Sequence, residues 1–156
     1  MSGRQQDRRM SEQHPGKPER TMIDTWIERY GRAWHDKDAD GVAELFTEDA
    51  TYAAHPVKEP HRGRAAIRAY WRQATATQSD LRLHFGRPVV DGDRVAVEWW
   101  ATMDDPDWGP SRDDAAATMP GCLLLRFTDE GLCAGLREYW NVEFGRNVPA
   151  PVGWGE

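Results

Sequence analysis

The residue whose chemistry is most informative is an acid near the end of the chain, Glu138. Residues 119–144 contain two apolar runs separated by the turn sequence TDEG, a pattern that predicts an antiparallel β-hairpin. Because side chains alternate between the two faces of a strand, this hairpin places Glu138 on an apolar face. An apolar environment disfavours the charged form of a carboxyl group, so its pKa rises. Glu138 is therefore a candidate for moving a proton near neutral pH.

The register of this hairpin decides the surroundings of Glu138. If Phe127 pairs with Leu132, then Leu123 lies opposite Leu136 and Gly121 opposite Glu138. The expected apolar face is formed by Met119, Gly121, Leu123, Leu125, Phe127, Leu136, Glu138 and Trp140. The expected opposite face carries Cys122, Leu124, Arg126, Cys133, Arg137 and Tyr139. A shift by one residue would instead turn Glu138 towards solvent.

Two other residues have side chains that could act with Glu138. The hydroxyl of Tyr30 could donate a hydrogen bond to a carbonyl that gains charge as an enolate forms. His55 follows a predicted strand, where the mouth of a pocket would lie, and could be a second acid or base. Such a set abstracts a proton next to a carbonyl, as in cyclisation, isomerisation or dehydration, and needs no cofactor. The alternative is structural: Tyr30 also fits a helix core, and His55 precedes a proline as a loop residue does.

Three helices are expected in the first half of the chain, and they would position these residues. Thr21 begins the first helix, with Asp24 as part of an approximate capping box. Its apolar stripe consists of Ile23, Trp26, Ile27, Tyr30, Ala33 and Trp34. Asp38 caps a short second helix that continues to Phe46 and is followed by a strand at residues 50–54. Arg64 begins the third helix, whose inner stripe contains Ile67, Tyr70, Trp71 and Ala74.

The second half of the chain is predicted to be a sheet, and the side on which Glu98 lies is open. Asp91-Gly92 predicts a hairpin between residues 81–90 and 94–103. A two-residue loop would place Glu98 on the same face as Leu83 and Phe85, whereas three residues with a bulge would place it on the opposite face. The loop at 104–117 contains five Asp but lacks the spacing of a calcium site. We expect it to be solvated and expect no metal.

Length and charge limit the classes of protein to which the chain can belong. With 156 residues it has the length of one domain, which we place at residues 21–145. Residues 1–20 are polar and are expected to be disordered, and residues 146–156 are expected to form a loose tail. The net charge of −6, without a cluster of Lys and Arg, argues against nucleic acid or a membrane as a partner.

The unusual residue types indicate a pocket and a reducing compartment. Eight Trp are many for this length, and they suit either a core around an apolar ligand or simply a thick core. Cys122 and Cys133 do not face each other in the expected register, so we expect two free thiols and a cytoplasmic protein.

The order of elements resembles the nuclear transport factor 2-like fold, and within it the SnoaL-like group, which contains polyketide cyclases. The resemblance covers about residues 22–144, and its most specific part is FTEDATYAAHPVKEPHRGRAAIRAYWRQ at residues 46–73. It implies an α+β cone in which three N-terminal helices and a curved antiparallel sheet enclose a pocket for an apolar small molecule. The convex sheet face often forms a dimer in this fold, which implies a homodimer.

Ketosteroid isomerase has the same fold and can be laid over this chain without gaps from Tyr30 to Gln73. Its oxyanion-hole tyrosine falls on Tyr30 and its pocket tryptophan on Trp140. Its general base falls on Ala54 and its second oxyanion donor on Leu123, so we do not expect that isomerase activity. The pattern and the overlay together predict a pocket lined by Trp26, Trp34, Tyr52, Tyr70, Glu98, Leu123, Leu136 and Trp140.

Two functions are compatible with these residues. One is a small cofactor-independent enzyme of the SnoaL-like type, with Glu138, Tyr30 and His55 as the catalytic groups. The other is a module of the same fold that binds a small ligand or dimerises without catalysis. A pocket whose acid has no orienting partner would favour the second.

Overall fold

The structure is a computed structural model that describes residues 18–156. The predicted disordered tail at residues 1–20 therefore lies outside the described residues except at its end, where Arg20 already belongs to the first helix.

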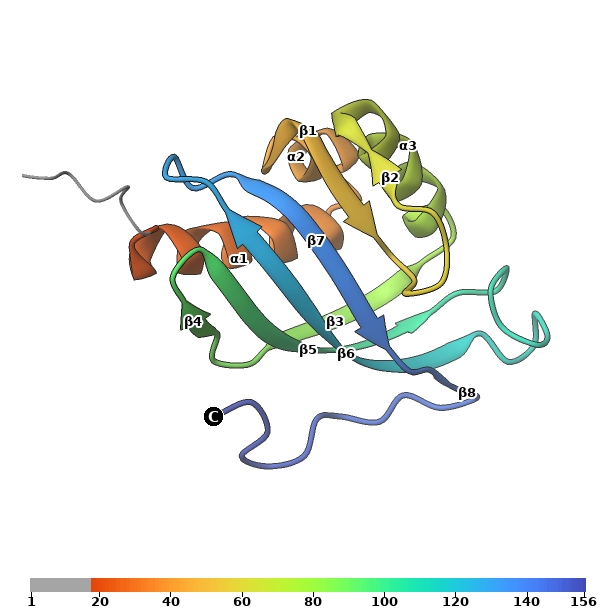
Figure 1. Ribbon diagram of the computed structural model, residues 1–156. Helices are drawn as coiled ribbons and strands as arrows, with labels where there is room; N and C mark the ends of the chain where they lie inside the picture. Colours follow the sequence, from red (N-terminus) through yellow and green to blue (C-terminus); the bar gives the residue numbers. More distant parts are fainter. Residues whose placement is uncertain (1–17) are drawn as a thin grey trace, which may run out of the picture.

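In residues 18–156, three helices and eight strands form one unit (Figure 1), and its three helices and α+β class agree with the prediction. The helices are α1 (Arg20–His35), α2 (Ala39–Ala43) and α3 (Gly63–Thr75). The strands are β1 (Phe46–Ala53), β2 (His61–Arg62), β3 (Ser79–Phe85), β4 (Val89–Asp91), β5 (Arg94–Asp104), β6 (Ala116–Phe127), β7 (Cys133–Trp140) and β8 (Glu143–Phe144). Within the described residues, no helix is long and apolar enough to cross a membrane.

All strands belong to one curved sheet in the order β2-β1-β7-β6-β5-β3, with β4 beside β5 and β8 beside β6. The pairs are antiparallel except β1 and β7, which run parallel, so the predicted antiparallel sheet is in fact mixed. The helices cover one side of the sheet (Figure 1), and we call this side the inner face and the opposite side the outer face. Side chains from α1 pack onto the inner face, where the Trp26 and Phe127 ring centroids lie 5.5 Å apart.

The β6–β7 hairpin forms as predicted, but with a register shifted by two residues. Leu123 pairs with Glu138 and Gly121 pairs with Trp140. Because side chains alternate with a period of two, the shift leaves Glu138 on the expected apolar face. The shift has two local causes of one residue each. Phe127 pairs with Cys133 instead of Leu132, and a bulge between Arg126 and Phe127 adds a further residue on the β7 side.

The same bulge corrects the position of Cys133, which we had expected on the outer face. Cys133 pairs with Phe127 and with Phe46 and is buried. Cys122 lies on the outer face, as expected, and pairs with Glu98 of β5. Both thiols are free.

The helix starts follow the predicted caps only in part. Asp38 caps α2 as expected, accepting a hydrogen bond from the Gly41 N–H at 2.9 Å. The N-cap of α1 is Glu19 rather than Thr21, and no side chain caps this end. Asp24 instead pairs with Arg20 at 3.0 Å. The second helix ends at Ala43, so residues 46–49, which we expected in or directly after this helix, begin β1 instead.

The C-terminal segment, residues 146–156, is not the loose tail that we expected. It runs along the outer face (Figure 1), where Trp100 Nε1 donates a hydrogen bond to the Val148 carbonyl at 2.8 Å. Trp154 packs against the rings of Trp100 and His84 at centroid distances of 5.8 and 5.6 Å. Aromatic contacts and backbone hydrogen bonds therefore hold this segment on the sheet.

Candidate functional site

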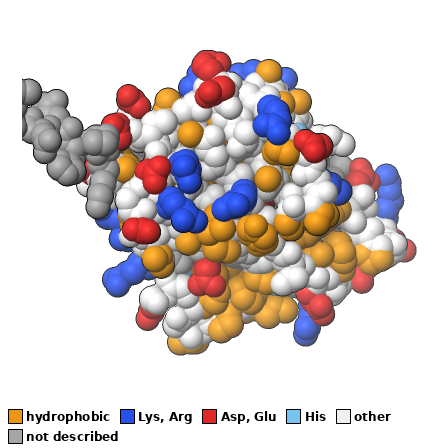
Figure 2. Space-filling model, in the orientation of Figure 1, with side chains coloured by type: hydrophobic (Ala, Val, Ile, Leu, Met, Phe, Trp, Pro, Cys, Tyr) orange, Lys and Arg blue, Asp and Glu red, His pale blue; other side chains and the backbone are white. Residues whose placement is uncertain are grey.

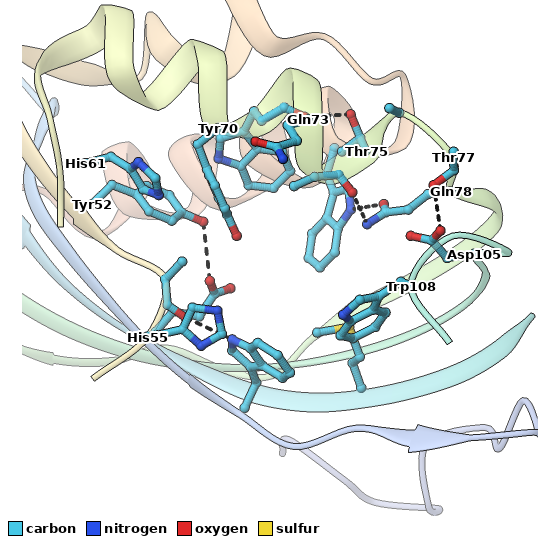
Figure 3. Close-up of a pocket in the computed structure, with 18 of the residues that line it drawn as sticks. Tyr52, His55, His61, Tyr70, Gln73, Thr75, Thr77, Gln78, Asp105 and Trp108 are labelled. Atoms are coloured by element: carbon cyan, nitrogen blue, oxygen red, sulfur yellow. Dashed lines mark hydrogen bonds between the residues drawn. The ribbon is translucent and has the colours of Figure 1, made fainter. Parts of the chain in front are cut away.

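The inner side of the sheet and α3 enclose a cavity of about 790 Å³, within the usual size range of small-molecule sites (Figure 3). Its walls are largely aromatic. The aromatic and histidine side chains that line it are Trp34, Tyr52, His55, His61, Tyr70, Trp71, Trp99, Trp108 and Trp140. The surplus of Trp therefore serves both the core and the cavity.

Glu138 lies in this cavity on β7, between the inner-face residues Leu136 and Trp140. It is only 6% exposed. Burial raises the pKa of its carboxyl group from 4.5 to about 8, against a smaller lowering effect of the hydrogen bond from Tyr52. At neutral pH this group therefore holds a proton.

Two tyrosines form a hydrogen-bonded chain that ends at the Glu138 carboxyl group. Tyr52, on β1, donates from its hydroxyl to Glu138 Oε2 over 3.5 Å, a long hydrogen bond. The hydroxyl of Tyr30, on α1, lies 2.9 Å from that of Tyr52, so Tyr30 can donate to Tyr52. Burial and the nearby Glu138 raise the pKa of both phenols well above the usual value. Both stay protonated and act as hydrogen-bond donors.

Two histidines lie at the same end of the cavity. His55 follows the end of β1, and its ring lies 5.2 Å from that of Trp140. His61, on β2, stacks on Tyr70 with ring centroids 4.5 Å apart. Burial lowers the pKa of both imidazoles, and Lys58 and His61 lower that of His55 further. Both rings are therefore neutral at neutral pH.

The loop after β5 forms the other end of the cavity. We expected this acidic loop to be solvated, but Asp105 is 5% exposed and accepts a hydrogen bond from the Thr77 hydroxyl at 2.6 Å. Trp108 packs against Trp140 and Phe144 with centroid distances of 5.7 and 5.1 Å. Figure 3 shows Asp105 and Trp108 across the cavity from Tyr52 and His55.

The predicted site residues fall into three groups. Trp34, Tyr52, His55, Tyr70, Glu138 and Trp140 line the cavity. Tyr30, Trp26, Leu123 and Leu136 are buried in the core next to it. Tyr30 thus reaches the cavity only through Tyr52.

Glu98 forms a group of its own and does not line this cavity. It is exposed on the outer face and pairs with Cys122. The hairpin loop has two residues, since Asp91 pairs with Arg94. However, the strand is interrupted at residues 86–88, between β3 and β4, and this break puts Leu83 and Phe85 on the face opposite Glu98.

Sequence reasoning missed the polar end of the cavity, formed by Thr77, Gln78, Asp105 and Trp108. These residues lie in connections between elements, where no periodicity indicates which way a side chain points. The Pro and Trp inside the acidic loop were the available signal, because a tryptophan in a solvated loop is uncommon.

Two tryptophans complete the cavity wall. Within residues 18–156, Trp71 Nε1 and Trp99 Nε1 are buried without a hydrogen-bond partner. Trp99 packs closely against Gly121, where an added Cβ would collide with its ring. In the same part of the chain, no group of three His, Cys, Asp or Glu side chains is arranged to hold a metal ion.

Comparison with known proteins agrees with this geometry. The SnoaL-like domain family matches residues 27–135. SalBIII, an epoxide hydrolase/cyclase-like enzyme with a role in pyran ring formation in the polyether salinomycin, superposes with a TM-score of 0.67 at 25% identity. The match covers 80% of this chain and 96% of SalBIII.

A second solved structure has the same fold. It is a hypothetical protein from Catenulispora acidiphila DSM 44928 with a ketosteroid isomerase-like fold, in complex with trimethylamine. It is 20% identical with a TM-score of 0.62, and the match covers 73% of this chain and 83% of that one. No curated protein sequence matches the chain. The match over residues 27–135, together with the shared fold, shows that the chain belongs to the SnoaL-like domain family of the nuclear transport factor 2-like superfamily.

Proposed function

We propose that this protein is a cofactor-independent acid/base enzyme that moves a proton next to a carbonyl group of an apolar substrate. The observation that carries this proposal is the buried Glu138 carboxyl group, hydrogen-bonded by Tyr52 and facing an aromatic cavity. Burial of this carboxyl group lowers the stability of the fold, and strongly shifted pKa values are typical of active sites.

The pKa shifts assign the roles of acid and base. Glu138 keeps its proton up to about pH 8, whereas His55 loses its proton below the usual pH. Neighbouring groups whose pKa values are pushed apart in this way can serve as acid and base at one pH. Glu138 is then the general acid and His55 the general base.

The corresponding reaction step is enolisation. His55 takes a proton from the carbon next to the carbonyl, while Glu138 gives its proton to the carbonyl oxygen, and a neutral enol results. The hydrogen bond from Tyr52 stabilises the carboxylate that Glu138 becomes, and Tyr30 holds Tyr52 in place. The enol can then close a ring, shift a double bond or eliminate water. The similarity to SalBIII, itself cyclase-like, supports ring closure as one outcome.

The alternative, a module that binds a ligand without catalysis, has less support. We expected such a module to have an acid without an orienting partner, and Glu138 has one in Tyr52.

A proton-exchange assay tests the proposal without knowledge of the natural substrate. The flat bicyclic ketone 1-tetralone is incubated with the protein in D₂O at pH 7, and loss of the proton next to its carbonyl is followed by NMR. We expect exchange above the buffer rate, and at least a hundredfold loss in Glu138→Gln. Glu130→Gln is the matched control, because it removes an exposed acid from the turn of the same hairpin. Equal exchange by wild type and Glu138→Gln would refute the proposed acid.

A further inference from the structure

We propose that the end of the cavity formed by Asp105, Thr77 and Trp108 binds a protonated amine carried by the substrate. This inference rests on the proposed function, since it concerns the same cavity, and it adds a charged group to an otherwise apolar substrate.

The Asp105 carboxylate has one oxygen that is hydrogen-bonded within the described part of the chain and one that is not. Its Oδ1 accepts hydrogen bonds from the Thr77 hydroxyl at 2.6 Å and from the Asp107 N–H at 3.3 Å. No hydrogen bond from the described part of the chain reaches Oδ2, and no Lys, Arg or His of residues 18–156 forms an ion pair with this side chain. The side chain nevertheless lines the cavity at 5% exposure. Oδ2 is not among the fully buried atoms without a partner, so it is open to the cavity, where a cationic donor would stabilise the carboxylate.

Three other polar side chains at this end, those of Trp34, Thr75 and Gln78, are already hydrogen-bonded within the protein (Figure 3). Trp34 Nε1 donates to Gln78 Oε1, and Gln78 Nε2 donates to the Ala74 carbonyl, both at 2.9 Å. The Thr75 hydroxyl donates to the Trp71 carbonyl at 2.7 Å. Asp105 Oδ2 accepts no hydrogen bond from the described residues and is free to accept one from a ligand donor. The exposed Gln73 side chain also lines the cavity but carries no charge.

The charged side chains that line the cavity near Asp105 do not pair with it. Asp107, also at this end, is already paired with Arg112 at 2.9 Å. Lys58 and Glu59 lie together in an exposed loop at the edge of the cavity, with opposite charges. Asp105 is thus a buried acidic side chain of the cavity wall to which residues 18–156 supply no ion-pair partner. Trp34, Trp99 and Trp108 also line the cavity. The face of an indole ring attracts cations, which favours an ammonium group over a neutral hydroxyl.

Two probes of the same shape test this directly. Binding of 1-naphthylmethylamine, which is protonated at pH 7, and of neutral 1-naphthylmethanol is measured by isothermal titration calorimetry on the full chain. We expect the amine to bind about tenfold or more tightly than the alcohol, as a hydrogen bond to a charged group implies. Equal affinities would overturn the inference, and so would absence of binding by both probes at millimolar concentration.

Asp105→Asn separates the charge from the structural role of this residue. Asparagine keeps an acceptor for Thr77 and for the Asp107 N–H, so the loop is expected to keep its shape. The variant should bind amine and alcohol with similar affinity, whereas Asp113→Asn, the same change at an exposed position of the same loop, should retain the preference. A preference that survives in Asp105→Asn would overturn the inference. If that variant fails to fold, Trp108→Leu is the second test, because it removes an aromatic ring face. It should reduce the preference for the amine severalfold, and an unchanged preference would overturn the inference.

The two proposals fail separately. Glu138→Gln should lose proton exchange on 1-tetralone but keep the preference for the amine. Loss of the amine preference alone leaves the acid/base function standing.

Discussion

Glu138 is held in a protonated form by burial, and this has consequences for stability as well as for chemistry. Unfolding exposes the carboxyl group to water, where its pKa returns to the usual value near 4.5. The folded chain therefore binds a proton that the unfolded chain releases over the intervening pH range.

The first prediction concerns stability against pH. Below about pH 4.5 both states are protonated and Glu138 carries no penalty. Between pH 4.5 and about 8 the unfolded state binds fewer protons, so the free energy of unfolding falls as pH rises. Glu138→Gln removes this pH-dependent contribution of Glu138. The free energy of unfolding of the variant relative to wild type should therefore grow over that range by up to about 4 kcal/mol. Urea unfolding at pH 5 and pH 8 measures the difference, and a constant difference would mean that Glu138 is solvated.

The second prediction concerns activity against pH. With His55 as base and Glu138 as acid, kcat/KM should follow a bell with an acid limb below pH 6.5 and an alkaline limb near pH 8. His55→Gln should lose most of the activity, while His35→Gln, an exposed control, should keep it. An unaffected His55→Gln would transfer the role of base to His61, to be tested by His61→Gln.

The third prediction separates the two tyrosines. Tyr52→Phe removes the donor to Glu138 and should reduce kcat by about tenfold to a hundredfold. Tyr30→Phe acts only through Tyr52, so a smaller loss with an unchanged KM is expected, with the alkaline limb of the pH profile displaced. A larger loss for Tyr30→Phe would show that Tyr30 contacts the substrate directly.

At the scale of elements, the pairing of β5 with β6 gives the cavity its floor. Trp99 stands opposite Gly121, and its indole occupies the space that a side chain at 121 would take. The absence of a Cβ at residue 121 leaves the space that the Trp99 ring occupies.

The fourth prediction follows from this contact. Gly121→Ala should push Trp99 into the cavity, lowering stability by about 1–3 kcal/mol and weakening binding of the naphthyl probes. Gly135→Ala is the control in the neighbouring strand, because its Cβ would meet only Thr51 Oγ1 at 3.5 Å. Equal effects of the two substitutions would show that Trp99 moves freely.

The sequence-based predictions succeeded where a repeating pattern decided the outcome. The face of Glu138 follows from alternation, which tolerates the register error of two residues. The side of Glu98 depended on an interruption at residues 86–88 that no local signal specifies, and the inward turn of Asp105 depended on a loop. Bulges and loops are set by tertiary contacts, so they were the part that could not be read from the sequence.

At the scale of the whole molecule, the outer face is divided between the C-terminal segment and open surface. Residues 146–156 cover the part of the outer face around Trp100. Arg137 and Tyr139 remain exposed, Tyr139 at 44%. Figure 2 shows hydrophobic side chains gathered in a band across the side of the molecule seen in Figure 1, next to a group of Lys and Arg side chains.

The last prediction joins these two parts of the outer face. We propose that two copies pair through the open part around Arg137 and Tyr139, so light scattering at micromolar concentration should give the mass of a dimer. Tyr139→Asp should give a monomer that keeps its fold, because the side chain points away from the core. Deleting residues 146–156 should act differently: it removes the hydrogen bond from Trp100 and the Trp154 packing, and should lower Tm by several degrees. If the deletion rather than Tyr139→Asp produced monomers, the C-terminal segment itself would be the interface. A wild-type monomer would refute pairing altogether.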